Sequence, residues 1–127
     1  MHQPVEALTL QALSLALSAA GQRHQVIAAN MANAGTVGYV PLRLSFESHL
    51  AQARQVLAER GTVDAASLAA VRIETEPAAD PHGQASPVQL DAAMVDLARN
   101  AVHYQALTQG LSRHLAIHAL AVADGRR

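Results

Sequence analysis

The stretch HQVIAANMANAGTVGYVP, residues 24–41, marks the point at which a long apolar helix has to stop. It places two asparagines three residues apart, Asn30 and Asn33, and follows them with the turn-forming run GTVG and one aromatic residue, Tyr39. Glycine is a common residue just past a helix end, because it accepts the left-handed backbone conformation found there. Gly35 is therefore expected to end the helix.

The asparagine pair has two interpretations. Asparagine is an ordinary choice for capping a helix and forming the turn after it, and then both side chains serve their own chain. An asparagine amide also offers two donors and an acceptor, which can hold backbone groups of a neighbouring molecule. The residues alone leave both interpretations open.

Upstream of this stretch, residues 1–34 predict a long helix that begins near Val5. Leu8 and Leu15 give it a wide apolar face, as in a helix that contacts more than one partner. The main stripe follows alternating steps of three and four residues, the spacing of a coiled-coil contact. Its members are Leu10, Leu13, Leu17, Ala20, His24, Ile27 and Met31.

Downstream, residues 87–127 predict a second long helix. Ser86 is expected at its N-cap, Pro87 at its first position, and Gly125 at its end. A helix of about 35 residues spans roughly 50 Å at 1.5 Å per residue. Its stripe again alternates steps of four and three, through Leu90, Met94, Leu97, Ala101, Tyr104, Thr108, Leu111, Leu115, His118 and Val122.

The middle of the chain, residues 35–86, lacks such a stripe. Residues 40–46 alternate loosely between apolar and polar, which indicates an extended segment or one arm of a short hairpin. LAQARQVLAERG, 50–61, predicts a short helix that ends at its glycine, and LAAVRIETE, 68–76, predicts a strand. PAADPHGQASP, 77–87, predicts a loop. Few apolar residues are available here to offset the entropy of ordering, so a loosely ordered middle is expected.

The predicted fold class is therefore all-α, with two long terminal helices that form a coiled-coil-like pair and a loosely ordered segment between them. The three regions are 1–34, 35–86 and 87–127. Such an architecture leaves apolar stripes exposed unless the helices find partners, so the pattern itself favours assembly.

Composition argues against several classes of protein. The 127 residues include no cysteine, which excludes disulfides and thiolate metal sites. The basic residues are all arginines and are scattered, so no patch for nucleic acid is expected. The first ten residues lack the basic segment of a secretory signal. Residues 8–20 are too short and too polar to span a membrane, so no membrane insertion is expected.

Catalytic and metal-binding sets are weak. His114 and His118 share a helix face but lack a third ligand, so no metal site is expected. His103 and Tyr104 stand near Asp96 in the sequence, but Asp96 and Tyr104 lie about two helical turns apart. We predict no catalytic, cofactor-binding or metal-binding residue, and we do not expect an enzyme.

The helix end and the second helix together resemble a known family. GQRHQVIAANMANAGTVGY, 21–39, resembles the N-terminal signature of flagellar basal-body rod proteins, A-x-N-x-A-N-x-x-T-P-G-Y. RLSFESHL, 43–50, resembles the segment that follows it in FlgB-like proximal rod proteins, and LDAAMVDLARNAVHYQALTQGLSRHL, 90–115, is similar to their terminal helix. The sequence departs from the signature at Gly35, Val37 and Val40, where the family commonly has Asp, Pro and a basic residue.

The resemblance implies a structural subunit of the proximal rod, the hollow shaft that transmits motor torque. It implies export without a cleaved signal by the flagellar type III apparatus, and assembly in the periplasm, in the flagellar basal body. The implied partners are further copies of the chain, other rod proteins, and the export gate or its adaptor. The implied subunit contacts are Asn30, Asn33, Thr36, Gly38, Tyr39, Leu97, Tyr104, Leu107 and Leu111.

The same sequence features allow a second function that does not involve the rod. A small helical adaptor or secretion chaperone would bind one partner through the same apolar stripes. The Asn-x-x-Asn turn separates the two readings, because a chaperone has no evident need for it.

Overall fold

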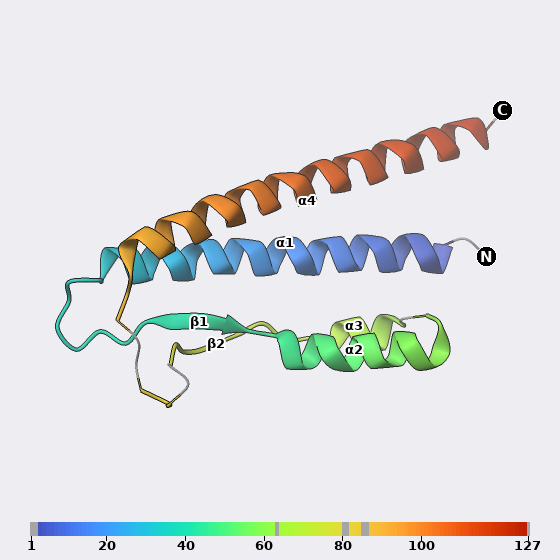
Figure 1. Cartoon of the computed structure of the whole chain (residues 1–127). Coiled ribbons are helices and arrows are strands. Elements are labelled where there is room, and N and C mark those ends of the chain that lie inside the picture. The colour runs from blue at the N-terminus through green and yellow to red at the C-terminus, as the bar shows by residue number, and fades with distance from the viewer. Residues whose placement is uncertain (1–2, 63, 80–81, 85–86, 127) are drawn as a thin grey trace.

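The computed structural model describes residues 3–62, 64–79, 82–84 and 87–126, and it is built around two long helices (Figure 1). The prediction of a long helix at each end of the chain is confirmed. The class is mostly α rather than all-α, because the middle also carries two short paired strands. In chain order the elements are α1 (Gln3–Ala32), β1 (Leu42–Ser45), α2 (Glu47–Arg60), α3 (Ala65–Ala69), β2 (Glu74–Pro77) and α4 (Leu90–Asp124).

Helices α1 and α4 pack against each other in opposite directions, so both termini lie at the same end of the molecule (Figure 1). The buried residues of their contact are small. Ala19 and Ala20 of α1 are buried, and Asn100 of α4 is only 5% exposed. The Asn100 Nδ2 atom donates a hydrogen bond of 2.8 Å to the carbonyl oxygen of Ala20. This bond meets the polar requirement of a buried amide and fixes the two helices in one register.

The register of α4 differs from the predicted stripe. Its non-exposed positions are Ala93, Leu97, Asn100, Leu107, Leu111 and His114, which follow the four-three spacing if Tyr104 is included. Only the positions one heptad apart, Leu97, Tyr104 and Leu111, belong to both stripes. At three intervening steps the prediction took the more apolar neighbour, and at the fourth it took Thr108 although Leu107 is the half-buried residue. The helix presents Asn100, which meets its hydrogen-bonding requirement on α1.

The pairing of the helices does not extend along the whole of α4. Every described residue after His114 is exposed, and Figure 1 shows α4 moving away from α1 toward the termini. The predicted coiled-coil-like pair is therefore limited to the part of α4 nearer its N-terminus.

Several predicted helix ends need correction. Helix α1 ends at Ala32, and Gly35 does not have the left-handed conformation expected of it. Helix α4 begins at Leu90 rather than Pro87, because Gln89 has an extended backbone with φ −96° and ψ 105°. The predicted cap Ser86 lies outside the described residues. The end of α4 at Gly125 is confirmed.

The middle of the chain forms a two-stranded ribbon and a helical arm. Strands β1 and β2 pair antiparallel, with Arg43 opposite Glu76, and the two side chains form an ion pair of 2.7 Å. The strands are not a local hairpin, because α2 and α3 lie between them in the sequence. The predicted helix end at Gly61 is confirmed, with φ 73°. The predicted strand 68–76 is mostly wrong, since its first residues belong to α3 and the turn after it.

Asp64 explains why the chain becomes helical again at α3. Its Oδ1 atom accepts a hydrogen bond of 2.8 Å from the backbone N–H of Ser67, so Asp64 is the N-cap of this helix. Hydrogen bonds from the Ser67 side chain and backbone lower the pKa of the Asp64 carboxyl group. Such capping favours a helix start over continuation of a strand.

The chain buries little for its size. Its accessible surface is 9203 Å². A compact monomer of 13.3 kDa would expose about 6,400 Å² by the usual scaling of surface with mass. Among the described residues, the buried hydrophobic side chains are few, and most of them are small: Ala19, Ala20, Leu44, Ala53 and Val71.

We expect Asn100 to control the pairing of α1 with α4. Asn100→Asp would set a carboxylate against the Ala20 carbonyl oxygen, and Asn100→Ala would only remove a hydrogen bond worth about 0.5–1.5 kcal/mol. Because the chain has no cysteine, Gln25→Cys and Gln105→Cys allow specific spin labelling on the two helices. The distance distribution between the labels should be narrow in the parent, broader in Asn100→Ala and broadest in Asn100→Asp. A narrow distribution in Asn100→Asp would show that the amide does not hold the pair.

Candidate assembly interface

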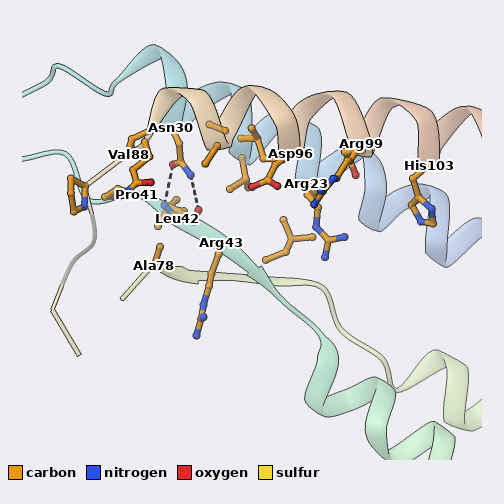
Figure 2. A pocket seen from close by; sticks show the side chains of 18 residues that line it. Arg23, Asn30, Pro41, Leu42, Arg43, Ala78, Val88, Asp96, Arg99 and His103 are labelled. Carbon is orange, nitrogen blue, oxygen red and sulfur yellow. Dashed lines mark hydrogen bonds between the residues drawn. The ribbon is translucent and has the colours of Figure 1, made fainter. Parts of the chain in front are cut away.

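Asn30, near the end of α1, holds the start of β1 with its side chain. Its Nδ2 atom donates to the Leu42 carbonyl oxygen at 2.7 Å, and its Oδ1 atom accepts from the Leu42 backbone N–H at 3.0 Å. The Tyr39 hydroxyl donates to the same Oδ1 atom at 2.8 Å. Figure 2 shows the two bonds to Leu42 as dashed lines. The amide thus acts on Leu42 as a neighbouring strand would, through one donor and one acceptor.

Asn33 organises the end of the helix one turn later. Its backbone N–H and its Nδ2 atom both donate to the carbonyl oxygen of Ala29, at 3.1 and 2.9 Å. Its Oδ1 atom accepts from the Thr36 hydroxyl at 3.3 Å, and its carbonyl oxygen accepts from the Thr36 N–H at 3.0 Å. These bonds satisfy groups that a helix end leaves open.

The loop then closes with a tight turn over Thr36–Tyr39. The Tyr39 N–H donates to the Thr36 carbonyl oxygen at 3.2 Å, and Gly38 has a φ of 81°. A positive φ at the third residue, with none at Val37, is the pattern of a type II turn. Proline is favoured at the second position of this turn, and glycine at the third. The Val37 side chain, at the turn's second position, is 99% exposed.

The first interpretation of the asparagine pair therefore describes its bonds: both side chains serve their own chain. The structure gathers five of the predicted contact residues, Asn30, Asn33, Thr36, Gly38 and Tyr39, in this one loop. What the loop presents outward is its tip, around Val37. Contact of this tip with another subunit stays a prediction.

The other predicted contact residues lie along α4 and are not equivalent. Leu97, Leu107 and Leu111 are half-buried on the side of α4 that carries Asn100. Tyr104 is exposed. The three leucines therefore belong at least partly to the pair within this chain.

The apolar residues left open on α4 form two groups that sequence reasoning did not separate. One group lies beside the Asn100 stripe and continues to the end of the helix: Leu90, Met94, Leu115 and Val122. The other lies across the helix at heptad-like spacings: Val95, Val102, Ile117 and Leu120. A helix with apolar residues on so many sides is typical of one surrounded by other helices.

Asn100 itself was missed as a functional position. Asn100 is a polar residue at a position of the apolar stripe, and such residues fix the register of coiled coils. Stepping the stripe through Leu97, Asn100 and Tyr104 would have found it.

The remaining chemistry of the described residues is sparse. His114 is half-buried and His118 is exposed, and no group of three potential metal ligands occurs among the residues that the structure describes. In the same part of the chain, no helix is apolar enough over its length to cross a membrane.

No known family model matches this chain, and no curated protein matches it either.

The type II turn gives a test at three positions. Val37→Pro should stiffen the turn, because no hydrogen bond among the described residues uses the Val37 N–H. Gly38→Ala should strain it, since an added Cβ meets a positive φ. Gly35→Ala is the control, because its φ is not in the left-handed region and its Cβ would have open space.

The readout is hydrogen exchange of the Leu42 amide, which donates to Asn30. A gain of about 0.4–1 kcal/mol from Val37→Pro corresponds to exchange slowed roughly two- to fivefold. Gly38→Ala should speed exchange by a similar factor, and Gly35→Ala should not speed it. Slower exchange in Gly38→Ala would mean that the turn is not type II.

Proposed function

We propose that this chain is a structural subunit of the flagellar basal-body rod, of the proximal, FlgB-like kind. The observation that carries the proposal is the turn after Asn30. The family signature has Pro and Gly at the positions of Val37 and Gly38, and a type II turn favours those two residues there. The signature thus has a physical reason in the backbone of this chain, although Val37 replaces the proline.

The exposed faces of α4 support the same proposal. Fully burying one leucine or valine side chain is worth about 1.5–3 kcal/mol, and α4 leaves several of them open. In a tube of packed helices these faces would meet neighbouring subunits. The proposed partners are further copies of the chain, other rod proteins and the export gate or its adaptor. The proposed location is the periplasmic rod, reached without a cleaved signal.

Deletion of the gene followed by a swimming assay and imaging of basal bodies tests the function. The rod proposal predicts non-motile cells without a completed rod. Motile cells with complete basal bodies would contradict it. A chaperone would instead leave its partner unstable and form a soluble complex with it, which purification of the partner would detect.

Two substitutions on α4 test assembly. Leu115→Asp separates it from folding of the chain, whereas Leu111→Asp also acts on the α1–α4 pair, in which Leu111 is half-buried. Leu111→Asp and Leu115→Asp should each abolish swimming, because an unpaired carboxylate buried between subunits costs several kcal/mol. Leu115 is 48% exposed in the single chain, so Leu115→Asp should leave the chain itself nearly unchanged. Export handles an unfolded chain, so both variants should still be exported.

Leu115→Met is the matched control, because it keeps an apolar side chain of similar size at the same position. Cells with Leu115→Met should swim. Normal swimming with Leu115→Asp would show that this face of α4 does not contact other subunits.

A further inference from the structure

A cleft lies where α1, β1 and the N-terminal part of α4 meet (Figure 2). Its volume is about 670 Å³, and its lining is more apolar than polar. The apolar residues of the lining include Val26, Ile27, Pro41 and Val88. Clefts of this size, with few polar groups at defined places, are the usual form of a binding site.

The charged groups of the cleft gather toward one end. Arg23 of α1 and Arg99 of α4 both line it, and Figure 2 draws them toward the same region, with His103 one helical turn farther along α4. Asp96, one turn before Arg99, brings the one carboxylate of the lining, while Arg43 is paired with Glu76. By formal charge, the described lining has three arginines, Arg23, Arg43 and Arg99, and one carboxylate.

Asn100, which also lines the cleft, donates to the Ala20 carbonyl oxygen, but three other polar side chains of α4 in the lining have no such bond. Among the described residues, Arg99, His103 and Asp96 form no hydrogen bond or ion pair with one another or with neighbours. Arg23 lies over the Phe46 ring, with its guanidinium carbon 5.4 Å from the ring centre, which holds its side chain in place. Arg23, which packs on Phe46, and Arg99 are thus suited to bind one carboxylate, which can accept hydrogen bonds from both guanidinium groups.

The shape of the cleft favours a peptide. The part of α4 that lines it runs from Ala92 to His103, about 17 Å at 1.5 Å per residue. That length matches about five extended residues at roughly 3.3 Å each.

We propose that this cleft binds an extended acidic peptide segment of a partner protein, with an aliphatic side chain against Val26 and Val88 and a carboxylate at Arg23 and Arg99. The proposal does not depend on the rod function, because it rests on the cleft alone. The Asp96 carboxylate repels such a peptide, so replacing it by asparagine should raise the affinity, whereas loss of an arginine should lower it.

The probe is a blocked, fluorescein-labelled peptide, Leu-Glu-Leu-Glu-Leu, titrated with the full chain at low ionic strength and followed by fluorescence anisotropy. Its partner probe replaces each glutamate by glutamine. Arg99→Gln should weaken binding of the acidic peptide about fivefold or more, and Asp96→Asn should tighten it about twofold. Arg113→Gln, on the same helix outside the cleft, should change nothing.

Equal affinity for the two peptides, or none for the acidic one, would overturn the proposal, because the charges would then play no part. Displacement of the acidic peptide by an equal concentration of acetate would also overturn it, since a simple anion site would remain. Far-UV circular dichroism checks that Arg99→Gln keeps the parent's helicity. If it does not, the opposite shift expected of Asp96→Asn still decides the result.

Discussion

Among the described residues, the buried part of the contact between α1 and α4 is two alanines and one amide, and the rest of the structure follows from how little that contact encloses. The bond from Asn100 to the Ala20 carbonyl oxygen fixes where the helices cross. The small side chains beside it allow a close approach but contribute little buried area. The larger apolar residues of α4 therefore stay on the surface, and the chain exposes far more area than a compact protein of its mass.

A second amide connects the helices to the ribbon. Leu42 lies opposite Pro77 in the ribbon, and Pro77 has no N–H to donate. The backbone N–H and carbonyl oxygen of Leu42 form their hydrogen bonds with Asn30 instead of β2. Pro77 is tolerated because it occupies a pair that exchanges no ladder hydrogen bonds. Pro77 and Asn30 thus belong to one arrangement, in which α1 supplies the hydrogen bonds that β2 does not give to the start of β1.

The sequence predicted the long helices and the special character of Asn30 and Asn33, because periodicity and turn residues act locally. It did not predict the pairing of residues 42–45 with 74–77, since nothing local connects segments that are separated by α2 and α3. The register of α4 was also wrong at alternate steps. Hydrophobicity favours Met94 and Ala101, whereas the helix contact selects Ala93 and Asn100 by size and by one hydrogen bond across the interface. The cleft lining combines residues from distant segments, so no motif marks it.

The central claim is that this chain is built to be completed by other molecules. Thermal unfolding of the dilute chain, followed by circular dichroism at 222 nm and shown to be monomeric by sedimentation, tests it most directly. The account predicts a shallow loss of helix with no sharp transition, because the monomer lacks a core large enough for cooperative unfolding. A steep, two-state transition that does not depend on concentration would contradict it.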